Sequence, residues 1–198
     1  MTRIDEALRR HAPQLIEADS MRRAAVAMIL RDRGDDTEVM FIKRAEAEND
    51  PWSGQIAFPG GGHEASDPTL ADAAIRETME ETAVAITHQQ EIGRLDDLQG
   101  SSRSQAMNLM IACYVYRLDA APVPVPNYEV AEVFWTPLSQ LRDTSRQIHY
   151  QTRFRDEPYP AVHLGHGRDG ADRILWGLTY RFVQGFLKII AADSAGSG

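Results

Sequence analysis

GQIAFPGGGHEASDPTLADAAIRETMEETAV, residues 54–84, is the stretch that decides the fold class of this chain. It places a glycine-rich turn, residues 59–62, directly after a short apolar run, residues 56–58. A helix is predicted to begin near Asp67, because an aspartate carboxylate accepts a free backbone N–H at a helix start and Pro68 suits the first helical position. The stretch therefore predicts a loop of accessible backbone beside a helix.

The predicted helix carries an acidic edge. At about 100 degrees per residue, Glu77, Glu80 and Glu81 fall within one arc of roughly 100 degrees. Like charges at these spacings cost roughly 0.2–0.5 kcal/mol per pair, so the edge is either a solvated surface or the lining of a site for a hard divalent cation. The preceding glycines favour the cation, because they let the backbone approach a metal or a phosphate closely. The face expected to pack on the core comprises Leu70, Ala71, Ala74, Ile75 and Met79.

The glycine turn followed by Arg76-Glu77-x-x-Glu80-Glu81 resembles the signature box of the Nudix hydrolases. These enzymes cleave nucleoside diphosphates linked to another group, using Mg²⁺ or Mn²⁺. GQIAFPGG, the RETMEE run and the WGLT segment at 176–179 are most similar to the coenzyme A pyrophosphatase branch. The resemblance implies an α/β fold, a Nudix-type α/β/α sandwich around a mixed β-sheet. It extends over most of residues 24–190 and is dense only in 54–84 and in WGLT.

Pyrophosphate hydrolysis needs charge neutralisation on two phosphates and a nucleophile made from water, and a divalent metal supplies both. We assign Glu80 and Glu81 as the principal metal ligands and Glu77 as a ligand or as the base that orients water. The resemblance implies that Arg76 holds a box glutamate by a salt bridge and does not touch the substrate.

The remaining assignments concern the substrate and the general base. Substrate contacts are expected from Arg44, Gln55, Gly60 and Gly61, and the carbonyl of Gly60 is a further candidate metal ligand. Two carboxylates later in the chain, Glu129 and Glu132, are candidates for the general base.

The box also departs from the family pattern. Gly62 and Pro68 stand where the box has a glycine and a glutamate, so that glutamate is absent, and Glu64 or Asp67 is expected to take over part of its role. Aligning Gly61 instead implies one extra residue in the loop, a spacing associated with the coenzyme A branch. Thr78 and Ala83 replace a usual aliphatic residue and a usual glycine.

The substrate is less well defined by the sequence than the chemistry. Arg44, Gly54 and Gln55 match the upstream motif of the coenzyme A branch, whereas Asp50 and Trp52 replace an arginine and a histidine. Losing a cation weakens contact with an extra phosphate, such as the 3′-phosphate of coenzyme A. ADP-ribose, a dinucleotide or an NDP-sugar is the alternative substrate. A non-catalytic ligand-sensing module is a third reading, against which the three intact glutamates argue.

The composition of the chain restricts the kinds of molecule that it is expected to bind. The 198 residues are 43% hydrophobic and 25% charged, with a net charge of −8 and a pI of about 5.2. This balance argues against nucleic-acid binding, so an anionic small molecule must be attracted by a local cation. The single cysteine, Cys113, is interpreted as a small buried hydrophobe; it excludes an internal disulfide and indicates a reducing, cytoplasmic location. No membrane span or signal peptide is expected, and a homodimer is left open.

Three parts are predicted along the chain: an N-terminal helical extension at 1–20, the Nudix hydrolase domain at 21–192 and a disordered tail at 193–198. The extension is expected to be an amphipathic helix over 3–18, with Ile4, Leu8, Leu15 and Ile16 buried and with a break at Pro13. Within the domain, a hairpin is predicted over 21–43, a central strand over 107–118, a proline-rich loop over 120–127 and a strand with a short helix over 129–141.

The last third of the domain gives weaker signals. Residues 142–170 are expected to form a hairpin or an irregular excursion, and 173–191 a closing amphipathic helix. His163 and His166 have a spacing found in metal sites, but no Cys, Asp or Glu in a matching pattern is seen beside them. They are therefore not assigned as a ligand pair.

Overall fold

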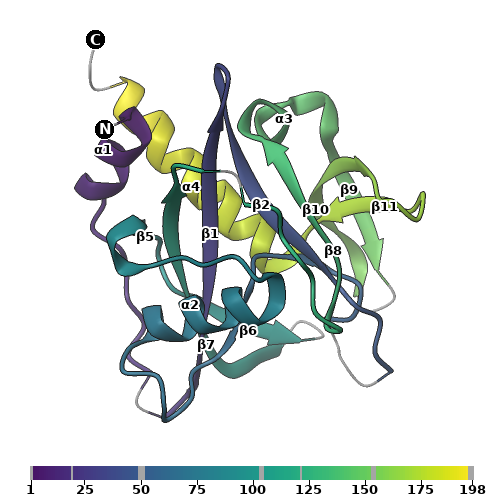
Figure 1. The fold of residues 1–198 in the computed structure, drawn as a ribbon. Helices are drawn as coiled ribbons and strands as arrows, with labels where there is room; N and C mark the ends of the chain where they lie inside the picture. The colour runs from purple at the N-terminus through teal and green to yellow at the C-terminus, as the bar shows by residue number, and fades with distance from the viewer. Residues whose placement is uncertain are drawn as a thin grey trace.

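A mixed eight-stranded sheet forms the centre of the molecule (Figure 1). The structure, a computed structural model, describes residues 2–18, 20–48, 52–102, 105–120, 122–152 and 155–195. The strands of this sheet are β1 (Arg22–Arg33), β2 (Asp36–Arg44), β3 (Ile56–Ala57), β4 (Gly60–Gly62), β5 (Glu91–Arg94), β6 (Leu98–Ser102), β7 (Gln105–Leu118) and β8 (Val130–Pro137).

A smaller sheet and four α-helices complete the described chain. The second sheet has the order β11-β10-β9, with β9 at Gln147–Thr152, β10 at Arg155–His166 and β11 at Asp172–Leu175. The α-helices are α1 (Arg3–Arg10), α2 (Leu70–Thr82), α3 (Leu138–Arg142) and α4 (Gly177–Ala195), and two short 3₁₀ turns, His88–Gln90 and Thr144–Arg146, lie between elements. Within the described ranges, no helix is long and apolar enough to cross a bilayer.

The predicted hairpin and central strand are confirmed. Strands β1 and β2 pair antiparallel from Leu30↔Val39 to Arg33↔Asp36. Strand β7 pairs parallel with β1 over its full apolar run and antiparallel with β5 and β6. The buried Cys113 lies in this run and belongs to the core, where burial raises the pKa of its thiol.

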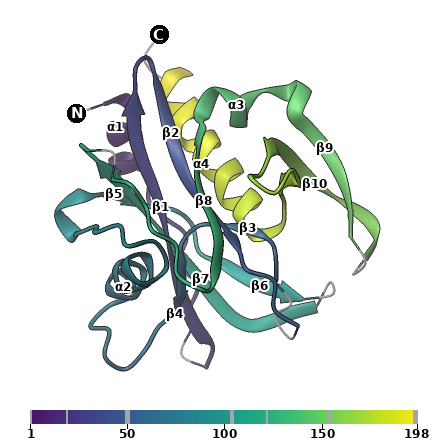
Figure 2. The same cartoon turned by 45° about the vertical axis from the view of Figure 1, so that its right-hand side comes forward.

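The sheet is covered on both faces, which confirms the predicted α/β/α sandwich. Because side chains alternate along a strand, β1 directs Ala25, Ala27 and Ile29 towards α2, and Met28 and Leu30 into the core on the opposite face. That second core includes Phe182, Phe186 and Ile190 of α4 together with Leu8 of α1. Figure 2 shows α2 and α4 on opposite sides of the sheet.

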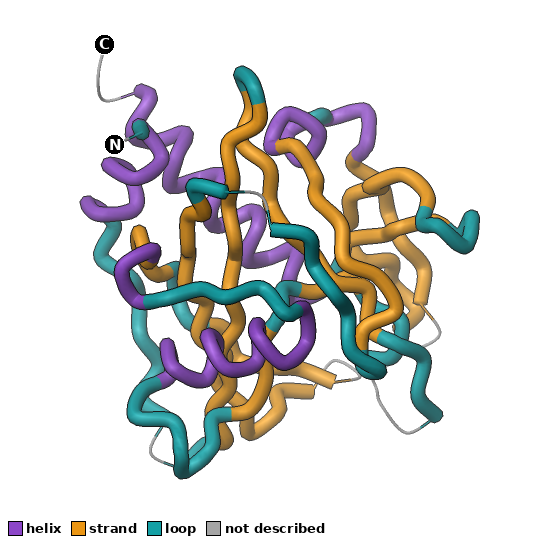
Figure 3. The backbone as a smooth tube through the Cα atoms, in the orientation of Figure 1, coloured by secondary structure: helices purple, strands orange, loops and turns teal. Residues whose placement is uncertain are grey.

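Two predicted helices differ from the structure at their starts or ends. The N-terminal helix ends at Arg10, and 11–18 run without helix (Figure 3), so the side chain of Leu15 is 60% exposed rather than buried. Pro13 lacks the N–H that a continuing helix needs. The closing helix begins at Gly177, because residues 172–175 pair with β10 as a strand. It continues through Ala195, three residues into the predicted tail; residues 196–198 lie outside the described residues.

The region after β8 matches its prediction in outline. A short helix follows the strand, and a hairpin of β9 and β10 follows that helix. The proline-rich segment 122–127 has neither helix nor strand, as predicted, because proline cannot donate to a sheet ladder.

Candidate active site

Helix α2 begins three residues later than predicted. Thr69 is the N-cap: its Oγ1 accepts a hydrogen bond from the Asp72 N–H at 3.2 Å, and Asp72 Oδ2 accepts one from the Thr69 N–H at 2.9 Å. This reciprocal capping box satisfies two free donors at once, so Asp67 and Pro68 remain in the preceding loop. Asp67 is thereby released for another contact.

The buried face of α2 is rotated relative to the predicted one. Met79 is 52% exposed, so its assignment to the core was wrong. The buried positions follow a helical period through Ala71, Ala74, Thr78 and Glu81, and the small residues on this face allow the helix to lie against the alanines of β1,. The rotation draws a glutamate of the acidic edge into the interior.

Glu81 is the most deeply placed of the three glutamates, at 2% exposure. Its Oε2 accepts a hydrogen bond from the Gly60 N–H at 2.9 Å, and its Oε1 lies 4.0 Å from Nη1 of Arg44. Burial raises the pKa of its carboxyl to about 7, and repulsion from Glu77 and Glu129 adds to the rise. The carboxylate is therefore held in place but only partly neutralised.

The glycine turn fits closely against the acidic edge and the first strand. Gly60 has φ +149°, and a Cβ there would lie 2.3 Å from the carbonyl oxygen of Ala25. A Cβ on Gly61 would lie 2.5 Å from Oε1 of Glu77. A side chain at position 60 would have to displace the backbone of β1, so glycine is required there, whereas a side chain at position 61 would have to push away the carboxylate of Glu77,.

Arg76 links the loop to the helix. Its Nε and Nη2 donate to the two carboxylate oxygens of Asp67, both at 3.0 Å, and Nη2 also donates to the carbonyl of Gly62 at 3.0 Å. Its Nη1 donates to Glu77 at 2.9 Å and to Glu80 at 3.3 Å. These bonds raise the pKa of the guanidinium and, on the other side, lower the pKa of the Asp67 carboxyl.

Asp67 thus occupies the position opposite Arg76 that the departure at Pro68 leaves open. Glu64 bonds through its side chain to the Ser66 hydroxyl at 3.4 Å, and its backbone N–H donates to Asp67. Of the two carboxylates considered for the missing glutamate, the one paired with the arginine is Asp67.

Glu77 and Glu80 complete the acidic edge. Burial raises the pKa of the Glu77 carboxyl, Arg76 lowers it, and Glu80 and Glu129 raise it further by repulsion. The side chain of Glu80 is 55% exposed, so it faces the solvent side of the site. The donor set consists of oxygen atoms, and the carboxylates repel one another, which are the properties of a site for a hard divalent cation.

The two candidates for the general base lie in different surroundings. The charge of Glu129 acts on both Glu77 and Glu81, so Glu129 belongs to the same site. Glu132 is buried, and both its carboxylate oxygens accept hydrogen bonds from Arg173, at 3.0 Å and 2.5 Å. A carboxylate held in this way is already paired and is not available as a base.

The predicted substrate contacts lie next to the acidic edge. The Arg44 N–H donates to the Gln55 carbonyl at 3.0 Å, and the Gln55 N–H donates to the Trp52 carbonyl at 3.1 Å. Arg44, at the end of β2, therefore lies between this turn and Glu81. Asp50, whose identity departs from the coenzyme A pattern, lies outside the described residues.

The proline-rich loop joins the site at the end of α2. Val125 N–H donates to the Thr82 carbonyl at 2.8 Å, and Asn127 N–H donates to the Glu81 carbonyl at 3.1 Å. The prolines of the same loop also border a cavity of 330 Å³, which is lined on its other sides by residues that include Trp135 and Arg168. The loop is therefore part of the wall beside the acidic edge.

The comparison with known families identifies the class of protein. The NUDIX domain model matches residues 21–156. The chain belongs to this family, the class of Nudix hydrolases, which act on phosphoric anhydride bonds and generally use divalent metal ions.

Individual relatives agree with the family. The chain is 29% identical over 167 residues to the uncharacterized Nudix hydrolase NudL of Yersinia pestis, covering 82% of this chain and 77% of that protein. It is 32% identical over 107 residues to an uncharacterized protein of Schizosaccharomyces pombe, covering 52% of this chain and 32% of the longer protein. The crystal structure of a MutT/nudix family protein from Enterococcus faecalis shares the fold, with a TM-score of 0.57 and 18% identity over 96% of this chain and 66% of that one.

Proposed function

We propose that this chain is a metal-dependent pyrophosphohydrolase that cleaves the diphosphate of coenzyme A or of a related nucleoside diphosphate derivative. The observation that carries the proposal is the contact between the acidic edge of α2 and the glycine turn. Glu81 bonds to Gly60, and Glu77 lies against Gly61. Three carboxylates therefore lie beside a turn whose glycines have no side chains to fill the space next to them.

The proposed ligands are Glu80 and Glu81, with Glu77 as a further ligand or as the residue that orients water. A bound Mg²⁺ or Mn²⁺ supplies Lewis acidity and lowers the pKa of its water. Arg76 acts on the ligands rather than on the substrate, because its donors are already bonded to Asp67, Glu77 and Glu80. Glu129 is the proposed general base, since it shares the site and its side chain is exposed.

The substrate side of the proposal rests on Arg44 and the turn next to it. A guanidinium beside Glu81 is suited to binding a substrate phosphate. The Gln55 carbonyl accepts a hydrogen bond from the Arg44 N–H, and Gly61 lies against Glu77. Similarity of GQIAFPGG and WGLT to the coenzyme A branch supports coenzyme A. Trp52 in place of a histidine supports the alternative, namely ADP-ribose, a dinucleotide or an NDP-sugar.

A substrate panel tests both parts of the proposal. Hydrolysis of coenzyme A, ADP-ribose and NADH would be measured with and without Mn²⁺. Glu80→Gln and Glu81→Gln are each expected to lower kcat by about 10²–10³-fold, because a metal ligand contributes several kcal/mol to transition-state stabilisation. Glu64→Gln is the matched control, since it removes an exposed acid near the site whose side chain accepts a hydrogen bond from the Ser66 hydroxyl at 3.4 Å.

Each alternative predicts its own result. Undiminished turnover in both ligand variants would refute the metal assignment. Faster turnover of ADP-ribose than of coenzyme A would favour the second substrate class. Saturable ligand binding without metal-dependent turnover would identify a sensing module.

A further inference from the structure

Three side chains of the second sheet converge on one point outside the proposed active site. His163 Nε2 and His166 Nδ1 each lie 2.9 Å from the same oxygen, Oδ1 of Asp172. The three donor atoms all lie within 4.8 Å of one another. The two imidazole rings stand nearly perpendicular, with centroids 5.5 Å apart. Asp172 is the carboxylate that the sequence pattern around the histidines did not reveal.

A β-bulge is responsible for this convergence. Residues three apart in a regular strand point to opposite faces of the sheet, so His163 and His166 would not meet. The register between β10 and β11 shifts between these two residues, where His163 pairs with Ile174 and His166 with Asp172. Gly165, at φ +93°, provides the left-handed backbone of the shift,. Gly165, between the two histidines, is the sequence feature that could have indicated this bulge.

The hydrogen bonds of His163 indicate which of its ring nitrogens carries the proton. Gly165 N–H donates to His163 Nδ1 at 3.3 Å, so His163 carries its proton on Nε2 and donates it to Asp172. A metal at Nε2 needs the proton on Nδ1 instead, and the competing Gly165 bond is long and therefore weak.

We propose that His163, His166 and Asp172 form a second metal site, separate from the acidic edge of α2, which binds a late divalent transition metal such as Zn²⁺. Two imidazoles and one carboxylate are a common ligand set for Zn²⁺, with water in the fourth position. Tetrahedral Zn²⁺ places its ligand atoms roughly 3.4 Å apart, so the two 2.9 Å contacts need to open by a few tenths of an ångström. Mg²⁺ prefers oxygen ligands and fits the glutamates instead.

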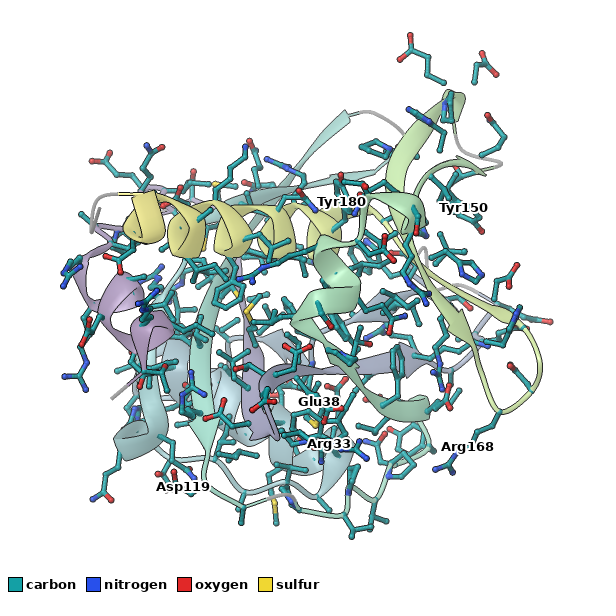
Figure 4. All side chains as sticks on the ribbon, turned by 90° about the horizontal axis from the view of Figure 1, so that it is seen from above. Arg33, Glu38, Asp119, Tyr150, Arg168 and Tyr180 are labelled. Carbon is teal, nitrogen blue, oxygen red and sulfur yellow. The ribbon has the colours of Figure 1, made fainter. Side chains whose placement is uncertain are left out.

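The position of the site indicates its role as a clip on the β10–β11 hairpin. The turn of this hairpin contacts the central sheet through Asp169, which accepts a hydrogen bond from Lys43 at 2.5 Å. Arg168, labelled in Figure 4, lies on the same turn, 3.9 Å from Glu132 of β8. A metal that joins the two strands at the base of the turn would hold these contacts in place.

Zinc titration in excess Mg²⁺ tests the proposal. Mg²⁺ occupies oxygen sites and competes poorly for imidazole, so calorimetry of the metal-stripped, full-length protein would report the histidine site. We expect one equivalent of Zn²⁺ to bind and to raise Tm. His163→Ala and His166→Ala should each weaken binding at least about tenfold. With Cu²⁺ as the probe, electron paramagnetic resonance should show coordination by two nitrogens in the wild type and by one in either variant.

The control is His149→Ala, which removes an exposed histidine of β9 in the same sheet. It should bind Zn²⁺ as the wild type does. The proposal is wrong if Zn²⁺ does not bind in excess Mg²⁺, or if all three variants bind it equally. His166 is 68% exposed, so its variant is expected to fold normally, as circular dichroism would verify. Hydrolytic turnover is not part of the readout, so the result is independent of the proposed activity.

Discussion

Glu81 on α2 and Glu132 on β8 are both buried carboxylates beside the same sheet, yet their surroundings are opposite. The guanidinium of Arg173 donates to both carboxylate oxygens of Glu132, and a second guanidinium, that of Arg168, lies 3.9 Å away. Glu81 has one backbone N–H at 2.9 Å, one guanidinium at 4.0 Å and two repelling carboxylates. A buried charge that is fully paired contributes to structure, whereas one left partly uncompensated indicates a place for another cation.

The first test of this contrast removes the paired charge, that of Glu132. Glu132→Gln leaves the half-buried guanidinium of Arg173 with a neutral partner, and the free energy of unfolding should fall by about 3 kcal/mol,. Turnover by the folded fraction should stay within about twofold of the wild type. Urea unfolding and kcat would be measured on the same preparation. Full stability together with lost turnover would instead make Glu132 the general base.

The second test removes the exposed carboxylate of the site. Glu129→Gln should lower kcat by about 10²-fold, the usual contribution of a general base. Stability should not change, because Glu129 is tied to its neighbours through its backbone, which the substitution keeps: its N–H donates to Asn127 Oδ1, and its carbonyl accepts from the Ala45 N–H. Steady-state kinetics would separate kcat from KM. A loss of less than about threefold would show that another group accepts the proton.

The third test concerns stability and pH in the metal-free protein. The pKa of the Glu81 carboxyl is about 7 in the folded protein, raised by burial from its ordinary value of 4.5 in an exposed chain. Between these values the unfolded state binds fewer protons, so this residue makes the protein less stable as the pH rises. Glu81→Gln has no such cost and should be more stable by about 2 kcal/mol at about pH 8.

The stability difference for Glu81→Gln should disappear below about pH 4.5, where the carboxyl is protonated in both states. Glu80→Gln is the matched control, because Glu80 is exposed and should change stability by less than about 0.5 kcal/mol at either pH. Chemical denaturation at the two pH values, in the presence of a chelator, would measure both variants. Equal stability of Glu81→Gln and wild type at about pH 8 would show that burial of this charge has no cost.

These contrasts also explain which features could be predicted from the sequence. The acidic edge and the glycine turn could be predicted because each depends on neighbouring residues alone. The helical period brings Glu77, Glu80 and Glu81 to one edge of the helix, and Gly60 and Gly61 allow the backbone to approach closely. Strand pairing could be inferred in outline, since β1, β2 and β7 are long and apolar. Features that depend on a single competing local contact were less accessible.

Three errors have such local causes. The helix start was misplaced because the Thr69–Asp72 capping box competes successfully with Asp67. Met79 was assigned to the core because its side chain is apolar. Where α2 packs against the alanines of β1, however, the contact accepts only small side chains. The carboxylate beside His163 and His166 was not seen because it comes from the next strand and depends on the bulge at Gly165.

The smallest expected effect lies at the C-terminal end of α2, where Ala83 stands in place of a glycine. Its φ of 54° and ψ of 20° place it in the left-handed region, which costs an L-residue with a Cβ roughly 1–2 kcal/mol,. Ala83→Gly should relieve this strain and, after the greater entropy of glycine in the unfolded chain, raise stability by about 0.5–1 kcal/mol. Ala74→Gly, within the same helix, should instead lower stability by at least about 1 kcal/mol. Thermal and urea unfolding would compare the two variants, and a loss of stability in both would mean that the entropy of glycine in the unfolded chain outweighs the relief of strain at position 83.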